Sequence, residues 1–245
     1  EALSSLRPEL RPPALREYLP AVKRAFAGVD LRDLKQEVAI LQSAHHAHLL
    51  PLFGYCLDAA APCLVFPLMV GGSLRARIDL GPDDLASLYR MGRFTPEAPP
   101  SPLTWRQKLR AVVQAAEALA YLHAFHVLHR DVRPATILLD SSGRAKLACF
   151  GASSRLERGH AREYTPEAPS YRYMAPEVIS HLQCSEPSCD VFSFSLLLWE
   201  VTHRQVPFEG HSPVQAAFAS AMSRLRPALR PRTELQGFAP IISAC

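Results

Sequence analysis

Residues 129–140 read HRDVRPATILLD, a charged loop that leads directly into a short apolar strand. Five other stretches surround it in a set order. Upstream stand Ala21-Val22-Lys23 and Glu37, and downstream follow Cys149-Phe150-Gly151, Ala175-Pro176-Glu177 and Asp190-Val191-Phe192-Ser193-Phe194. Six such stretches in this order over residues 21–201 are very unlikely to occur by chance. This order decides the fold.

The set resembles the sequence motifs of the eukaryotic protein kinases. Residues 129–136 are similar to the catalytic-loop pattern HRDxKxxN, and the next three stretches stand where that family has DFG, APE and DVWSFG. Residues 21–23 resemble its VAIK strand, and Glu37 falls where the family has the partner glutamate of its C-helix. The resemblance implies an α+β, two-lobed protein kinase fold with a small β-rich N-lobe and a larger, mainly helical C-lobe.

Two further stretches indicate which group of protein kinases the chain resembles. Residues 45–74, which begin HHAHLLPLFGYC and end CLVFPLMVGGSL, and residues 103–109, LTWRQKL, look like plant receptor-like kinases and the interleukin-1-receptor-associated kinases. We therefore place the chain with the tyrosine-kinase-like group, whose active members mostly modify Ser and Thr. The resemblance implies protein partners or a protein substrate.

Composition agrees with one compact globular unit. The 245 residues are 48% hydrophobic, enough for a substantial core. The formal net charge of +4 is scattered along the chain and gives no support to nucleic-acid binding. No apolar run reaches the roughly 18 residues that span a bilayer, and the six cysteines lack zinc-binding spacing. We expect no membrane insertion in this segment and a cytoplasmic setting, either of the chain itself or as the cytoplasmic part of a longer protein.

Hydrophobic spacing predicts the main elements. Helices are expected where apolar residues recur every three or four positions, first from Asp30 onward and later over 191–201. Two antiparallel strands are expected over 49–57 and 63–69. A Thr-x-x-Gln capping box at Thr104 opens a long helix. The predicted buried stripe of that helix is Leu109, Val112, Ala116, Leu119 and Leu122.

The chain is predicted to be a single protein kinase-like domain over 1–245. Residues 1–66 would form a partial N-lobe, 67–70 a hinge, and 71–245 a C-lobe that is truncated at its C-terminus. No glycine precedes Gly28. The glycine-rich loop that covers the phosphates in kinases is expected before the VAIK-like strand, so either the given sequence starts late or this phosphate cover is truly absent.

The resemblance assigns nucleotide contacts to five residues. Lys23 would hold the α- and β-phosphates of ATP while paired with Glu37; the alternative is a solvated lysine on a strand edge. Phe66 would be the gatekeeper, Pro67 would offer its carbonyl to adenine, and Met69 its backbone N–H. Proline has no backbone donor, but the position after the gatekeeper supplies only an acceptor. ATP could therefore still bind.

The residues expected to perform catalysis are only partly those of an active kinase. Asp131 would be the catalytic base, and Arg133 replaces a compact lysine with a rigid fork that could displace the γ-phosphate contact. Thr136 and Cys149 occupy the metal-ligand positions, where the family has asparagine and aspartate. A thiol is a soft ligand and a hydroxyl a weak one, so both are poor magnesium ligands. The alternative is that another carboxylate substitutes for the missing aspartate.

Residues 152–174 would be the activation segment. If a hydroxyl of this segment were phosphorylated, the Arg130 side chain would bind the phosphate. Ser170 is the first candidate for that phosphorylation, because it matches the family threonine three positions before Tyr173. Glu177 of the APE-like motif would lack its usual arginine partner. We expect each hydroxyl of this segment to be exposed in a flexible loop: Ser153, Ser154, Thr165, Ser170, Tyr171 and Tyr173. A spine linking the lobes and anchored at Asp190 would consist of Leu41, Leu52, His129 and Phe150.

The leading hypothesis from the sequence is a catalytically impaired kinase-fold protein, a pseudokinase, that acts as a signalling, scaffold or allosteric module. It could still bind ATP weakly, with little dependence on magnesium. The rival hypothesis is an active ATP-dependent Ser/Thr kinase that tolerates Cys149. A third is a fragment too truncated to fold alone.

Overall fold

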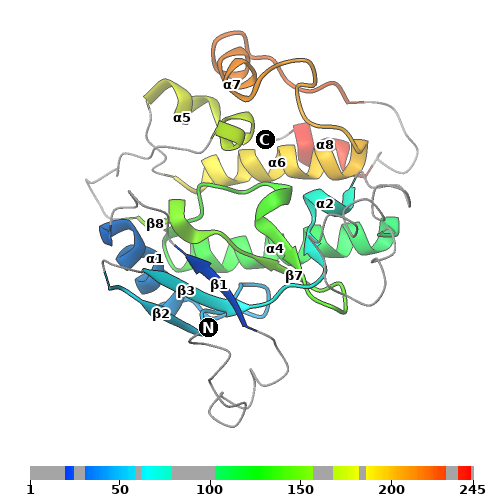
Figure 1. The fold of residues 1–245 in the computed structure, drawn as a ribbon. Helices are drawn as coiled ribbons and strands as arrows, with labels where there is room; N and C mark the ends of the chain where they lie inside the picture. The colour runs from blue at the N-terminus through cyan, green and yellow to red at the C-terminus, as the bar shows by residue number, and fades with distance from the viewer. Residues whose placement is uncertain are drawn as a thin grey trace.

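The computed structural model describes residues 20–24, 31–58, 62–78, 103–156, 168–181, 186–229 and 237–243, with the backbone alone at 20–24 and 181. Two parts are visible in Figure 1, a small sheet flanked by one helix and a larger, mostly helical part. This division confirms the predicted α+β, two-lobed architecture.

Three short strands make the small sheet, in the order β1-β3-β2, and both pairings are antiparallel. They are β1 (Pro20–Arg24), β2 (Gly54–Cys56) and β3 (Cys63–Pro67). The middle strand β3 is the most apolar, and its residues from Leu64 to Pro67 are buried. The two predicted antiparallel strands are therefore confirmed, although both are shorter than the predicted ranges 49–57 and 63–69.

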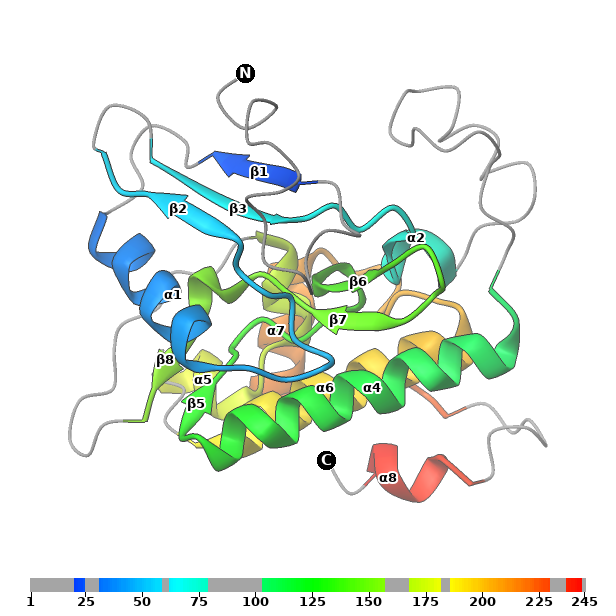
Figure 2. The ribbon, with the colours of Figure 1, turned by 90° about the horizontal axis from the view of Figure 1, so that it is seen from below.

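Helix α1 (Leu31–Ser43) lies next to this sheet (Figure 2). Its buried side also holds Glu37, which is 4% exposed. Gln36 Nε2 donates a hydrogen bond to the carbonyl of Ser153 at 3.2 Å, which ties the helix to the larger part of the molecule. Three apolar residues at helical spacing join the main core: Leu34, Val38 and Leu41.

Two long helices form the centre of the larger part. Helix α4 (Trp105–Ala124) begins with the predicted capping box, in which Gln107 N donates to Thr104 Oγ1 at 3.3 Å and Thr104 N donates to Gln107 Oε1 at 2.8 Å. Helix α6 (Pro187–His203) packs against α4 and confirms the apolar helix predicted over 191–201. The two helices run side by side in Figure 1. Within the described residues, no helix is both long enough and apolar enough to cross a membrane.

The stripe predicted to be buried on α4 is partly wrong, because Leu109 and Ala116 are only half-buried. Helix α6 and strand β7 (Ala145–Leu147) approach α4 closely. Small side chains permit this approach, so the buried face is centred on alanines instead of the largest residues. The buried residues of α4 are Lys108, Ala111, Val112, Ala115, Ala118, Leu119 and Leu122.

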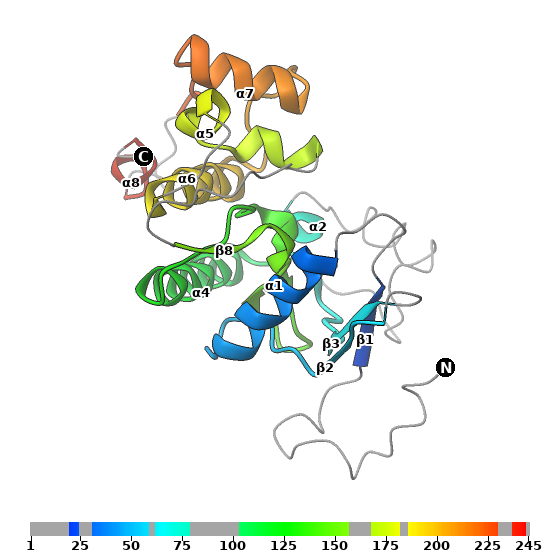
Figure 3. The same cartoon turned by 90° about the vertical axis from the view of Figure 1, so that its left-hand side faces the viewer.

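The other elements are short and pack around α4 and α6 (Figure 3). Strands β4, β6 and β7 form a second antiparallel sheet in that order, and β5 pairs with β8. The 3₁₀ helices are η3 (Pro134–Thr136), η4 (Phe150–Ala152) and η5 (Ala168–Tyr173). The strands are β4 (Gly72–Ser73), β5 (Val127–Leu128), β6 (Ile137–Leu139) and β8 (Ser154–Arg155). The helices are α2 (Arg75–Ile78), α5 (Pro176–His181), α7 (Pro213–Met222) and α8 (Ala239–Ser243).

The loop after α1 attaches the small part to the larger one. Leu50 N donates to the carbonyl of Leu147 at 2.9 Å, and Leu147 N donates to the carbonyl of His48 at 2.8 Å. Leu49 and Leu147 thus form a short parallel bridge. The C-terminal end of α1 is held against β7 by this pairing.

Two histidines of the same loop pack against α4. The His46 ring stacks on Tyr121 with centroids 5.1 Å apart, and His46 Nδ1 accepts the backbone N–H of His48 at 3.2 Å. His48 Nε2 lies 3.3 Å from a carboxylate oxygen of Glu117, and Lys146 Nζ donates to the loop backbone at 2.8 Å. Burial, then His48 and more weakly Lys146, lower the pKa of His46 below its ordinary value of 6.5, and Glu117 opposes them.

This lowered pKa predicts a pH-dependent stability. The folded protein holds the His46 proton less tightly than the unfolded chain, so the stabilisation is complete above about pH 6.5 and is lost as the pH falls through the lower folded pKa. Protonation at Nδ1 would also break the hydrogen bond from His48. We expect the melting temperature to fall between about pH 7.5 and about pH 5, and to fall less in His46→Asn, whose amide oxygen accepts without titrating.

Thermal melting across this pH range, with the exposed His211 changed to Asn as the matched control, measures the effect. The control should keep the wild-type pH dependence. Equal pH dependence in the wild type and in His46→Asn would show that this histidine does not sense pH.

Candidate functional site

The carboxylate of Asp190 anchors the start of the loop at 129–136. Asp190 lies in the first turn of α6 and is fully buried. Its Oδ2 accepts the backbone N–H of His129 at 2.8 Å, and its Oδ1 accepts that of Arg130 at 2.7 Å. His123 Nε2, on α4, lies 2.9 Å from Oδ2. One side chain therefore joins the loop to both long helices.

The backbone of Arg130 needs this anchor. Its φ is 66°, a left-handed conformation that costs a residue with a side chain about 1–2 kcal/mol. The hydrogen bond from its own N–H to Asp190 offsets that cost, because bonds to a buried carboxylate are charge-assisted. The residues that follow this turn, from Asp131 onward, make the contacts of the site.

The side chain of His129 connects the loop to the segment after β7. His129 Nε2 lies 2.9 Å from the carbonyl of Ala148, and Nδ1 accepts the backbone N–H of Asp131 at 3.3 Å. A carbonyl can only accept, so this ring carries its proton on Nε2. The ring packs edge-on against Phe150 with centroids 5.2 Å apart. Two more of the predicted spine residues join the same hydrophobic core as Phe150, namely Leu41 and Leu52.

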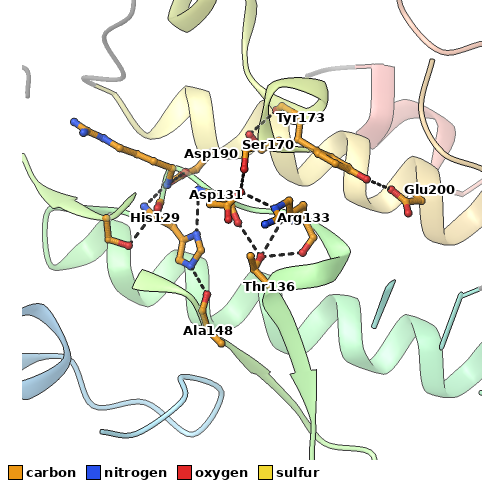
Figure 4. Close-up of polar contacts among 12 residues, drawn as sticks. His129, Asp131, Arg133, Thr136, Ala148, Ser170, Tyr173, Asp190 and Glu200 are labelled. Atoms are coloured by element: carbon orange, nitrogen blue, oxygen red, sulfur yellow. Dashed lines mark hydrogen bonds and ion pairs between the residues drawn. The ribbon is translucent and has the colours of Figure 1, made fainter. Parts of the chain in front are cut away.

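The carboxylate of Asp131, the expected catalytic base, is engaged by two side-chain donors. Arg133 Nε donates to Oδ1 at 2.8 Å, and Ser170 Oγ donates to the same oxygen at 2.8 Å. The side chains of Asp131 and Arg133 are 10% and 14% exposed. Figure 4 shows all three converging between the loop and η5. The arginine in place of lysine therefore bonds to the base itself.

The two residues at the metal-ligand positions lie in different environments. Thr136 is fully buried, and its Oγ1 lies 2.8 Å from the carbonyl of Asp131 and 2.9 Å from that of Arg133. The same oxygen accepts the backbone N–H of Arg133 at 3.2 Å. Cys149 is exposed and has a left-handed backbone, with φ 68° and ψ 62°. The threonine hydroxyl therefore closes the loop on itself, whereas Cys149 is an exposed residue.

A network around the buried Glu200, which the sequence analysis did not identify, lies beside this loop. Tyr173 Oη donates to Glu200, and the guanidinium of Arg75 pairs with the other oxygen of that carboxylate. Burial, followed by the Glu200 charge, raises the pKa of Tyr173, so the phenol stays protonated. The sequence does contain one sign of this network, because Glu200 is a single carboxylate within the apolar run LLLWEV. A carboxylate buried in such a run needs hydrogen-bond or ion-pair partners.

The activation-segment hydroxyls are less exposed than expected. Ser153, Ser154 and Ser170 are each at most 3% exposed, and Tyr173 is 8% exposed. The expectation of solvent exposure is therefore wrong for these four residues. Ser153 Oγ donates to the carbonyl of His129 at 3.2 Å. These serines are buried because their segment packs against the loop at 129–136. Thr165 lies outside the described residues, and Tyr171 is half-buried.

The residues expected to bind nucleotide are only partly placed. Lys23 lies in β1, opposite Leu64 of β3, but its side chain lies outside the described part, so the pairing of Lys23 with Glu37 stays a prediction. The expected gatekeeper and hinge residues are buried at or just after the end of β3: Phe66, Pro67 and Met69. The expected regulatory residues differ, since Arg130 is buried and Glu177 is exposed on α5.

A family model described as protein tyrosine and serine/threonine kinase matches residues 18–245. The chain belongs to this protein kinase family. It is 32% identical over 214 residues to the serine/threonine/tyrosine-protein kinase HT1 of Arabidopsis thaliana, which covers 87% of this chain and 50% of that protein.

Two receptor kinases are also similar to this kinase domain. The receptor-like protein kinase ANXUR2 of Arabidopsis thaliana is 34% identical over 177 residues, or 70% of this chain and 18% of that protein. The nodulation receptor kinase of Pisum sativum is 33% identical over 202 residues, or 81% of this chain and 20% of that protein. The chain thus spans half or less of the length of these relatives.

The anchoring role of Asp190 in the kinase domain can be tested by stability. Asp190→Ala leaves the buried N–H groups of His129 and Arg130 without an acceptor, at a cost of about 1–3 kcal/mol for each. We expect a loss of unfolding free energy of at least about 3 kcal/mol, measured by urea denaturation. Glu209→Ala, an exposed carboxylate, should change it by less than about 0.5 kcal/mol. A loss below about 1 kcal/mol in Asp190→Ala would contradict the anchoring role.

The closing role of Thr136 has a matched pair of variants. Thr136→Val keeps the shape but removes the hydroxyl, which leaves buried backbone groups unpaired and should cost about 1–3 kcal/mol of unfolding free energy. Thr136→Ser keeps the hydroxyl and should cost less. Urea denaturation compares the two, and a serine variant no more stable than the valine variant would rule out a structural role for this hydroxyl.

Proposed function

We propose that this protein kinase domain is catalytically impaired and acts through protein partners as a signalling, scaffold or allosteric module. The observation that carries the proposal is the pair of residues at the metal-ligand positions. Kinases hold magnesium with an aspartate and an asparagine at these places. Here they are Cys149 and Thr136, and neither supplies a negatively charged oxygen.

The donors present do not fit a magnesium ion. Magnesium requires near-octahedral coordination by oxygen ligands. The Thr136 hydroxyl is buried, and its single proton is already directed to the carbonyls of Asp131 and Arg133, which lie 2.8 and 2.9 Å away. The thiol of Cys149 is a soft ligand that suits other metals better. Without a metal, the charge of the triphosphate would not be neutralised, and its γ-phosphate would not be oriented for transfer.

The state of Asp131 supports the same proposal. Its Oδ1 accepts bonds from Arg133 and Ser170, so a substrate hydroxyl that used this oxygen would have to compete with both donors. Loss of one preorganised electrostatic group from a catalytic site costs about 3 kcal/mol, or about a hundredfold in rate. Loss of the charged metal ligand should cost at least that much.

Weak nucleotide binding is part of the proposal. Glu37 is buried on α1, where it could orient Lys23, and β3 leads into the Phe66 to Met69 segment expected to contact adenine. These contacts do not require a metal, so ATP would bind with little dependence on magnesium. The domain would act in the cytoplasm, alone or as part of a longer protein.

An active Ser/Thr kinase that tolerates Cys149 is the alternative. It is favoured by the retention of Asp131 and Glu37 and by relatives whose names are those of kinases. In that case phosphoryl transfer would require both Asp131 and Lys23. The two functions differ in one measurable property, the rate of phosphoryl transfer.

The deciding experiment is a radiolabelled-ATP assay of the full-length protein with Mg²⁺ or Mn²⁺. We expect no transfer above that of Asp131→Asn. We also expect the double variant Cys149→Asp with Thr136→Asn to gain activity, because it restores both oxygen ligands. Robust wild-type transfer that Asp131→Asn abolishes would overturn the proposal and establish the active kinase.

A folding control accompanies the assay. Thermal melting with and without ATP should show a cooperative transition that ATP shifts upward by mass action. The shift should persist in the presence of a chelator, because binding would not depend on magnesium. Absence of any transition would instead support a fragment that cannot fold alone.

A further inference from the structure

Two cysteines lie directly opposite each other in the small sheet. In the antiparallel pairing of β2 with β3, Cys56 is the register partner of Cys63. Both are reduced thiols in this structure, Cys56 exposed and Cys63 half-buried. We propose that Cys56 and Cys63 form a redox modification site, at which a peroxide oxidises the two thiols to a disulfide that links β2 to β3.

The geometry of an antiparallel pair suits this bond. Residues opposite each other send their side chains to the same face of the sheet. Their Cα atoms are about 4.5–5.5 Å apart, and a disulfide accepts Cα separations of about 4.4–6.8 Å. Little backbone movement is therefore needed to bring the sulfur atoms of Cys56 and Cys63 together.

The sheet holds the two cysteines in this register. Next to them, Tyr55 pairs with Leu64 and Gly54 with Val65. The other side of the middle strand β3 is paired as well, because Cys63 is the register partner of Arg24 in β1. A slip by one residue would turn the buried Leu64 to the other face, so the apolar core opposes it. The two thiols therefore stay opposite each other while the sheet is folded.

Exposure decides which thiol reacts first. The thiolate of Cys56, which solvent reaches, attacks one oxygen of the peroxide; the O–O bond breaks, hydroxide leaves, and a sulfenic acid forms. The thiolate of Cys63 then attacks that sulfur, the S–O bond breaks and hydroxide leaves. In total the two thiols lose two electrons and two protons, and one hydrogen peroxide becomes two waters.

The bond would stabilise the sheet that precedes the expected hinge. It closes a short loop between Cys56 and Cys63 and thereby restricts the unfolded chain. We expect oxidation to raise the melting temperature by roughly 5 °C. The site does not involve the loop at 129–136, so this inference stands whether or not the domain transfers phosphate.

The sequence offers a direct test. Trypsin cuts after Lys35 and Arg75 but nowhere between, so Cys56 and Cys63 fall in one peptide, Gln36–Arg75, with no third cysteine. The full chain is treated with hydrogen peroxide at a low molar excess, alkylated under denaturing conditions and digested with trypsin. The masses of the peptides are then measured by mass spectrometry. We expect this peptide to lose two hydrogens and to take no alkyl group, whereas without peroxide it takes two.

Variants separate the disulfide from other oxidation. Cys149→Ser removes another exposed thiol, at the start of η4, and should leave both the peptide mass and the rise in melting temperature unchanged. Cys56→Ser and Cys63→Ser should each abolish both effects. A wild-type peptide that still takes two alkyl groups, that carries sulfinic acid, or that is linked to a second chain would overturn the inference.

Discussion

A buried carboxylate is costly unless donors surround it, and the functional loop of this kinase domain is organised around one such group. Asp190 sits inside α6 and accepts the backbone N–H groups of His129 and Arg130. The desolvation of the charge amounts to several kcal/mol, and these charge-assisted bonds offset it. Because the bonds are short and come from consecutive residues, they fix both the position of the loop and the left-handed turn at Arg130.

From that turn onward the loop satisfies its own polar groups. The Thr136 hydroxyl bonds to the backbone of Asp131 and Arg133, and the Arg133 side chain bonds to the carboxylate of Asp131. Ser170 adds a second donor to that carboxylate. A loop whose polar atoms are paired with each other has fewer left for a metal or a phosphate. This internal pairing is one physical reason for the proposed loss of catalytic activity.

Regular patterns in the sequence were reliable wherever a single local interaction decides the structure. The Thr104 capping box depends on residues three apart, and it opens α4 as predicted. The apolar spacing of α1 likewise depends only on helical geometry. The stripe on α4 was partly wrong because Ala111 and Ala118 are buried for their small size, which matters only once α6 and β7 lie against them. Periodicity of large residues carries no information about that approach.

The sequence by itself determined the family, the order of the motifs and the identity of the altered ligand positions at Thr136 and Cys149. Only the tertiary structure decided that Arg133 bonds to Asp131, that Ser170 is buried against the same carboxylate, and that Tyr173, Glu200 and Arg75 form one network. Glu200 lies 125 residues from Arg75 along the chain. The physical reason is that motif positions are set by local chain geometry, whereas a side chain's partners are set by which distant segments the core brings together.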